Sequence, residues 1–95
     1  MRAYELIYII NPTIDEESTN AVIEKFKNLI ENNAGEITKL DKWGKKRLAY
    51  EIAKHNEGFY VLCNYNGEAE TTHELDRVLK ITDEVIKHLI IRVDE

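Results

Sequence analysis

Hydrophobic and polar positions change period several times along the chain, and each change marks an expected element. The run from Tyr4 to Ile10 is aromatic and β-branched and ends at Asn11-Pro12, so it predicts a strand. Acidic and capping side chains follow at residues 15–18, and apolar residues then recur at spacings of three and four: Val22, Ile23, Phe26, Leu29 and Ile30. This second pattern predicts an amphipathic helix that ends near Gly35.

The next segment alternates with the period of a strand. It is extended from Ile37, and after Gly44 the side chains of Leu48, Tyr50 and Ile52 point one way while residues 47, 49 and 51 point the other. We therefore expect a long second strand with a bulge near Gly44. The segment 54–58 predicts a turn and 59–65 a third strand, so the two strands should form an antiparallel hairpin.

The last third of the chain predicts one more helix and one more strand. Residues 70–79 have helical spacing, with Thr71 or Thr72 near the start of the helix, and residues 85–93 predict the final strand. The order βαββαβ indicates an α+β fold, the ferredoxin-like sandwich, in which a four-stranded antiparallel sheet carries two helices on one face. We expect a single domain over residues 1–95.

The sheet face away from the helices is expected to be more apolar than a sheet face that contacts only water. Glu5 assigns its side of the first strand to that face, and the third strand contributes a matching set. An apolar patch on an open sheet indicates a protein partner or an oligomer. The residues that we assign to partner binding are Ile7, Ile9, Tyr60 and Leu62.

Charge is distributed unevenly along the chain. The formal net charge is -5, yet residues 36–54 carry six cations and three anions, whereas the rest carries 7 cations and 15 anions. Local charges of +3 and -8 make a polar molecule with one positive edge, which suits an anionic partner better than the total suggests. A solvated charged hairpin is the alternative interpretation.

Catalytic and metal chemistry find little support in the sequence. Ser18 stands in a helix-capping context, and Cys63 lies within an apolar strand, where packing is the expected role. The histidines are not paired at ligand spacing, and we expect His88 to be a strand residue satisfied by hydrogen bonding. We therefore expect no enzyme activity, no metal and no cofactor. The lone cysteine and the short apolar run Leu6–Ile10 favour a cytoplasmic protein without a membrane span.

One segment resembles a known signature. Residues 44–53 read Gly-Lys-Lys-Arg-Leu-Ala-Tyr-Glu-Ile-Ala and agree at all ten positions with the pattern Gly, any, basic, polar or basic, Leu, small, Tyr, any, Ile, small or basic. That pattern is the signature of the S6 family of bacterial small-subunit ribosomal proteins. The resemblance extends through residues 1–5, Asn11-Pro12 and 77–85. Many members carry a polar C-terminal tail, whereas this sequence ends at Asp94-Glu95, so we expect no tail contact.

The resemblance implies the ferredoxin-like fold and a structural role in the small ribosomal subunit, without catalysis. It also implies binding to the central domain of small-subunit ribosomal RNA together with ribosomal protein S18. Lys45, Lys46 and Arg47 suit phosphate oxygens, Arg2 and Lys54 should extend the positive edge, and Trp43 is a candidate for base stacking. For Tyr50 we favour the core over RNA contact. The competing interpretation is a homodimeric, small-molecule-binding regulatory module, or an α+β-barrel enzyme, because this fold hosts many functions.

Overall fold

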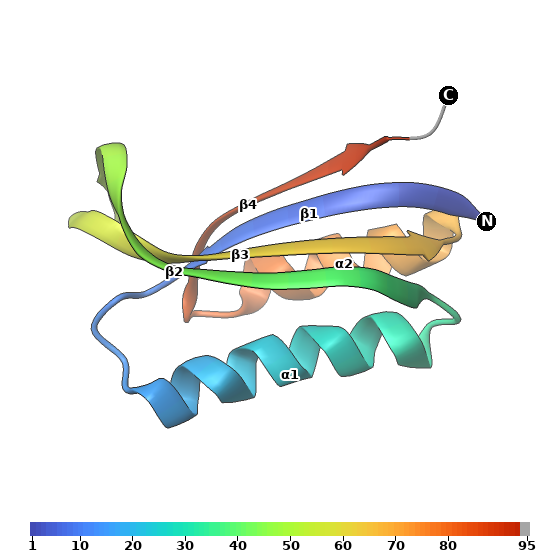
Figure 1. The fold of residues 1–95 in the computed structure, drawn as a ribbon, viewed down its shortest axis with the longest axis horizontal. Helices are drawn as coiled ribbons and strands as arrows, with labels where there is room; N and C mark the ends of the chain where they lie inside the picture. Colours follow the sequence, from blue (N-terminus) through green and yellow to red (C-terminus); the bar gives the residue numbers. More distant parts are fainter. Residues whose placement is uncertain (94–95) are drawn as a thin grey trace.

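One antiparallel sheet with two helices on the same face forms the structure, a computed structural model that describes residues 1–93. The elements are, in chain order, β1 (Arg2–Ile10), α1 (Glu16–Asn32), β2 (Glu36–Ile52), β3 (His55–Gly67), α2 (Ala69–Ile81) and β4 (Val85–Arg92). The strands lie in the order β2-β3-β1-β4, and all neighbours are antiparallel (Figure 1). The predicted ferredoxin-like fold is confirmed. Asp94-Glu95, where a tail contact was not expected, lies outside the described residues.

The core lies between the sheet and the helices. Leu6, Tyr8 and Ile10 of β1 alternate towards the helices, as predicted, and the aromatic ring of Tyr8 meets Phe26 of α1 edge to face at 5.4 Å between centroids. Apolar side chains from β3 and α2 complete the same cluster: Val61, Cys63, Tyr65, Leu75, Val78 and Leu79. The period-2 and period-3.6 stripes of the sequence therefore bury one face of each element.

Both helices begin and end at recognisable capping contacts. Asp15 caps α1 by accepting a hydrogen bond from the Ser18 backbone N–H at 2.7 Å. At its other end the chain turns with Ala34, not Gly35, in the left-handed region at φ 63°, and Gly35 is needed because a Cβ there would lie 2.6 Å from Ile30 Cγ2. Thr71 of α2 donates to the Asn33 carbonyl at 2.7 Å, so the two helix ends are joined.

The β2–β3 hairpin turns earlier and more tightly than the sequence predicts. Ile52 pairs with His55, which leaves Ala53 and Lys54 as a two-residue loop, and both have positive φ, at 50° and 67°. Two positive φ values are the geometry of a type I′ turn, which matches the twist of the flanking strands. The predicted turn over 54–58 is therefore wrong. Asn56 and Gly58 suggested a loop, but both lie within β3.

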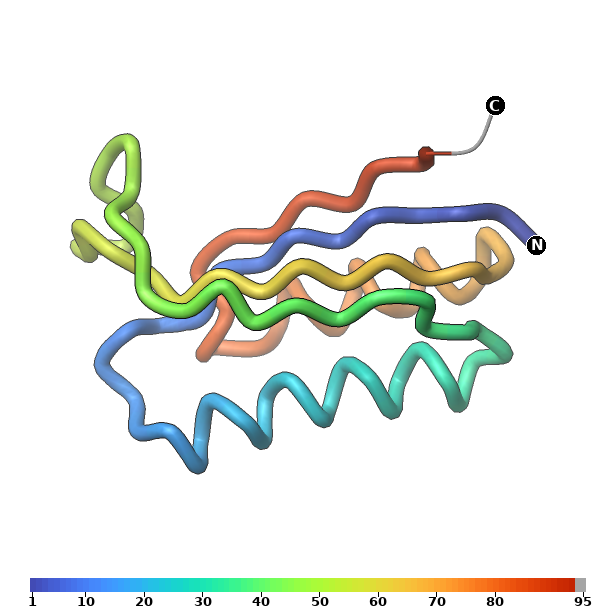
Figure 2. Tube along the Cα trace, viewed as in Figure 1, coloured from blue at the N-terminus to red at the C-terminus, as the bar shows by residue number. Residues whose placement is uncertain are grey.

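Three irregularities interrupt the pairing of β2 with β3: one lies between Ile37 and Lys39, and the other two lie nearer the hairpin tip. The predicted bulge is confirmed, because the pairing register shifts between Lys42 and Gly44, and Gly44 has φ 82° with open space around its Cα. A second irregularity, which we call the arch, comprises the four residues 48–51 of β2, which lie opposite the single β3 residue Asn56. The tip of the hairpin consequently curls away from α1, beyond the edge of the helical layer (Figures 1 and 2).

Candidate functional site

The consecutive cations of the signature segment point to two sides of the hairpin. Lys45 pairs with Phe59 and lies beside the first turn of α1, whereas Lys46 pairs with Gly58 and faces the open side of the sheet. Arg47 alternates back to the side of Lys45 and pairs with Glu57. All three side chains are exposed, and within residues 1–93 no ion pair neutralises them. The hairpin therefore presents positive charge on both of its sides.

An aromatic pair continues the charged hairpin onto the open sheet face. Trp43 stacks on Tyr60 with 6.4 Å between ring centroids, and the Lys46 ammonium lies 5.8 Å from the centroid of the indole. Trp43 remains 44% exposed. Lys46 and Trp43 thus lie together, as the sequence suggested, at the junction between hairpin and sheet.

Tyr50 is not a core residue, and the preference for that role is wrong. Its side chain is 61% exposed, because the stripe of Leu48, Tyr50 and Ile52 lies on the open side of the sheet, as Lys46 does, and not towards the helices. Leu48 is buried, with 7% of its surface exposed, but it does not join the core between sheet and helices. It packs on the open face, with Cδ2 3.6 Å from the position of a Cβ on Gly58.

The two outlying cations of the predicted RNA set lie at opposite ends of the molecule. Lys54 is in the hairpin turn and extends the positive tip as predicted. Arg2 begins β1 and pairs with Gly67, at the end of the sheet far from the hairpin (Figure 1). Arg2 lies eight residue steps from Ile10 along β1, which is roughly 26 Å at about 3.3 Å per residue. Arg2 therefore does not extend the positive edge.

The open sheet face is arranged in rows across three strands. Ile7 stands between Leu62 on β3 and Leu89 on β4, and Ile9 stands between Tyr60 and Lys87. Of the four residues predicted to bind a partner, Ile9 and Leu62 are nearly buried by their neighbours, at 6% and 7% exposed, and the other two are half-buried. These two buried side chains form the floor of the face.

Two exposed apolar residues of β4 on this face were missed by the sequence reasoning. Leu89 is 53% exposed and Ile91 is 41% exposed, in line with Ile7 and Glu5. The signal was present, because residues 87, 89 and 91 alternate with the inward-facing residues 88 and 90. The apolar face is therefore wider than β1 and β3 alone predict.

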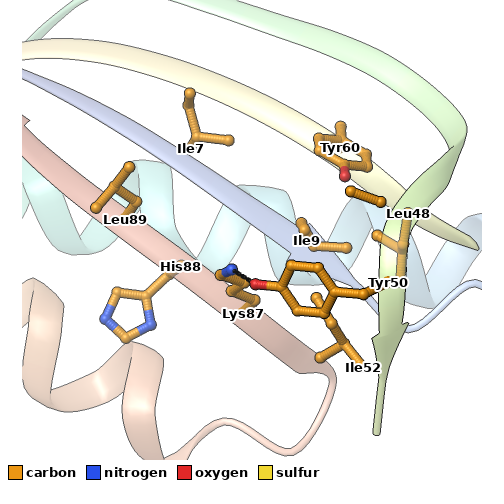
Figure 3. Close-up of a pocket in the computed structure, with 10 residues that line it drawn as sticks. Ile7, Ile9, Leu48, Tyr50, Ile52, Tyr60, Lys87, His88 and Leu89 are labelled. Atoms are coloured by element: carbon orange, nitrogen blue, oxygen red, sulfur yellow. Dashed lines mark hydrogen bonds between the residues drawn. The ribbon is translucent and has the colours of Figure 1, made fainter. Parts of the chain in front are cut away.

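A hollow of about 220 Å³ lies where the arch of β2 curls over this face. Figure 3 shows its walls: Ile7, Ile9 and Tyr60 belong to the sheet, Leu48, Tyr50 and Ile52 to the hairpin, and Lys87 and Leu89 to β4. The lining is mainly apolar, with one ammonium group and two phenol hydroxyls. Small-molecule sites typically enclose about 300–1,000 Å³, so this open hollow fits a side chain of a partner better than a metabolite.

The remaining reactive side chains are held in structural contacts. Cys63 is 3% exposed, as predicted, and burial raises the pKa of its thiol to about 11, so the thiol stays protonated at neutral pH. His88 forms the predicted hydrogen bond, through Nε2 to Asp76 Oδ1 at 2.7 Å. Within residues 1–93 no three His, Cys, Asp or Glu side chains gather as metal ligands. In the same range neither helix has the length and apolar character needed to cross a membrane.

Comparisons with known proteins agree on one family. The family model described as "Ribosomal protein S6" matches residues 3–92. The chain is 52% identical over 95 residues to small ribosomal subunit protein bS6 of Carboxydothermus hydrogenoformans, covering 100% of this chain and 99% of that one. It is 55% identical over the same length to the bS6 of Thermoanaerobacter pseudethanolicus, covering 100% of both chains.

A solved structure shows the same fold. The crystal structure of 30S ribosomal protein S6 from Thermotoga maritima superimposes with a TM-score of 0.91 at 34% identity, and the match covers 96% of this chain and 86% of that one. This chain and that S6 protein thus share the arrangement of strands and helices. The chain belongs to the ribosomal protein S6 family of the small ribosomal subunit.

Proposed function

We propose that this structural protein of the small subunit binds the central domain of the small-subunit ribosomal RNA together with ribosomal protein S18. The observation that carries the proposal is the junction of two surfaces at the β2–β3 hairpin. The cations Lys45, Lys46 and Arg47, which form no ion pair within residues 1–93, adjoin a half-buried apolar sheet face, and Lys46 and Trp43 belong to both surfaces. The hairpin suits RNA phosphates, and the adjoining sheet face suits an apolar protein surface. The two partners can therefore bind side by side on this protein, in a ribosome of the cytoplasm.

The RNA surface in this proposal is the hairpin. Lys45, Lys46, Arg47 and Lys54 contact phosphate oxygens, and Arg47 binds two oxygens at once through its planar guanidinium. Trp43 offers an exposed aromatic surface for an unstacked base, with Tyr60 supporting the other ring face. Tyr50 contributes at the hairpin tip, and Arg2 makes a separate contact at the far end of β1.

The protein surface is the open sheet face, and S18 is its proposed occupant. Ile7, Tyr60, Leu89 and Ile91 provide the accessible apolar area, above the floor formed by Ile9 and Leu62. Burying such a patch is favourable at roughly 25 cal/mol per Å² of apolar surface, whereas the acidic remainder of this chain repels RNA elsewhere. The partner therefore adds affinity that the hairpin charges alone do not supply.

The first test is charge reversal on the hairpin. Lys46→Glu combined with Arg47→Glu should weaken association with the ribosomal RNA central domain, in the presence of S18, by about tenfold or more at moderate salt. The slope of log affinity against log salt should become shallower by about 2, one for each phosphate contact removed. The control is Lys27→Glu on α1, which reverses one charge, half of the change in the double variant, on the helical side of the molecule.

The second test separates the two surfaces. Binding of S18 alone, measured by titration calorimetry without RNA, should survive the hairpin charge reversal to within about twofold. RNA association that is unaffected by Lys46→Glu with Arg47→Glu rules out the hairpin as the RNA surface. An equal loss with Lys27→Glu shows that only net charge matters, which likewise rejects the assignment.

A further inference from the structure

The hairpin tip is tied to the opposite edge of the sheet through one side-chain pair. Lys87 of β4 donates a hydrogen bond from its ammonium to the Tyr50 hydroxyl, and the same ammonium lies 4.9 Å from the centroid of the Tyr50 ring (Figure 3). Strands β2 and β4 are the two outer strands of the sheet, with β3 and β1 between them. This contact joins the two outer strands across the open face.

The arch makes this contact possible. Because four β2 residues lie opposite Asn56, the backbone leaves the sheet and returns, and its excess length carries Tyr50 over the face. Leu48 anchors the base of the arch, because its buried side chain packs beside Gly58. The space there is tight, since a Cβ on Gly58 would collide with Ile9. The tip is therefore fixed at its base by packing and at its outer end by Lys87.

We propose that Tyr50 and Lys87 are positioning residues that hold the hairpin tip over the hollow, so that the hollow and the hairpin cations are presented together. The inference rests on the proposed function and specifies how its two surfaces are coupled. Tyr50 and Lys87 both line the hollow, and Tyr50 lies in the same strand as Lys46 and Arg47. We call the contact between Tyr50 and Lys87 the tie. A partner side chain in the hollow contacts the tie directly and so stabilises the conformation of the cationic strand that binds RNA.

The tie provides affinity by preorganisation, not by adding a contact. A free hairpin tip loses conformational entropy when RNA orders it, whereas a tip already held by Lys87 has lost that entropy on folding. Tyr50 is 61% exposed, so removing its hydroxyl leaves no unsatisfied buried group and should not disturb the core. Its effect is therefore separable from global stability.

Amide hydrogen exchange on the free chain tests the tie itself. Tyr50→Phe keeps the ring and removes the hydrogen-bond acceptor, and Lys87→Met keeps the length and removes the charge. Each should raise exchange at residues 49–54 by about three- to tenfold, the range for one solvent-accessible hydrogen bond, and leave the β1 amides unchanged. The double variant should not exceed Lys87→Met, which removes both the hydrogen bond and the contact with the ring, and Lys87→Arg should restore protection.

Tyr60→Phe is the matched control, since within residues 1–93 the Tyr60 hydroxyl forms no hydrogen bond. It lies on the same face and loses the same atom, and exchange at the tip should stay as in the wild type. Unchanged exchange in Tyr50→Phe overturns the proposal, as does equal, additive loss in the double variant, which indicates two independent contacts.

Binding measurements then test what the tie is for. Tyr50→Phe should weaken RNA association of the complex with S18 by about three- to tenfold at an unchanged melting temperature. Faster exchange at the tip with unchanged binding overturns the positioning role. If the wild-type chain does not bind RNA, the proposed function fails by itself, while the exchange result still decides for or against a tie at the tip.

Discussion

His88 on β4 and Asp76 on α2 join the sheet to the helix through a 2.7 Å hydrogen bond between Nε2 and Oδ1. Lys80 approaches the second oxygen of the same carboxylate at 2.9 Å. The His88 hydrogen bond, and after it the Lys80 contacts, lower the pKa of Asp76 below its usual value. An ionised carboxylate only accepts hydrogen bonds, so His88 donates through Nε2.

This pair predicts a stability loss in acid. The folded-state pKa of Asp76 is lowered, so its contribution is complete above the unfolded pKa of about 3.9 and disappears as the pH falls through the folded value. Asp76→Asn should lower the free energy of unfolding at pH 7 by about 1 kcal/mol and make it less dependent on pH below about 4. Urea unfolding between pH 2.5 and 7 measures both effects.

The control for this prediction is Asp83→Asn, since the Asp83 side chain is exposed and forms no ion pair or hydrogen bond within residues 1–93. Its free energy of unfolding should stay within about 0.5 kcal/mol of the wild type at pH 7. An Asp76→Asn variant with the same acid slope as the wild type contradicts the assignment.

Gly58 should tolerate no larger residue. A Cβ at this position collides with Ile9 Cγ2 and lies 3.6 Å from both Leu48 and Ile86, so Gly58→Ala should lower the free energy of unfolding by about 1–3 kcal/mol through overpacking. Thermal unfolding and the Ile9 methyl resonance report the effect. Gly44→Ala offers the comparison, because its Cβ meets open space while its φ of 82° strains the backbone. There the methyl resonance of Ile9 should not move.

The fold was predictable from the sequence because each element buries one face with its own period. The stripes through Leu6, Tyr8 and Phe26 face the core as the alternation predicts. The hairpin tip was not predictable in the same way. Its turn uses Ala53 and Lys54 at positive φ, where sequence preference favours asparagine and glycine.

The candidate site was predictable in composition but not in arrangement. An alternation rule assigns Tyr50 and Leu48 to one side of the strand, and both do line the hollow, but alternation alone does not say which side faces the helices. Arg2 was placed with the hairpin cations on charge alone, although strand direction takes it to the other end of β1. The positions of Leu89 and Ile91, in contrast, follow the ordinary alternation of β4.

Lys54 combines an unfavourable backbone conformation with a proposed RNA contact. Its φ of 67° favours glycine, so Lys54→Gly should stabilise the fold by roughly 0.5–1 kcal/mol while weakening RNA association. Ala53→Gly is the matched control, with a φ of 50° and no charge to lose. It should stabilise similarly and leave RNA association unchanged. Equal RNA binding by both variants removes Lys54 from the RNA surface.

Leu89 should matter to the partner and not to the fold. With 53% of its surface exposed, Leu89→Glu should change the free energy of unfolding by less than about 0.5 kcal/mol. The same substitution places a charge in the apolar face and should weaken S18 binding by about tenfold or more. Ile81→Glu, at a residue 66% exposed at the end of α2, should leave partner binding unchanged. Calorimetric titration of both variants makes the comparison, and similar affinities reject the open face as the interface.

The central place of β1 in the sheet determines when folding can finish. Its two neighbours are β3 and β4, and β4 supplies Val85–Arg92 from the last part of the chain, so this pairing joins residues separated by most of the sequence. During synthesis the hairpin of β2 and β3 can pair with β1 early, but one edge of β1 keeps unpaired backbone groups until the final strand has emerged. A nascent S6 chain is therefore exposed to strand-mediated aggregation until β4 has emerged and paired with β1.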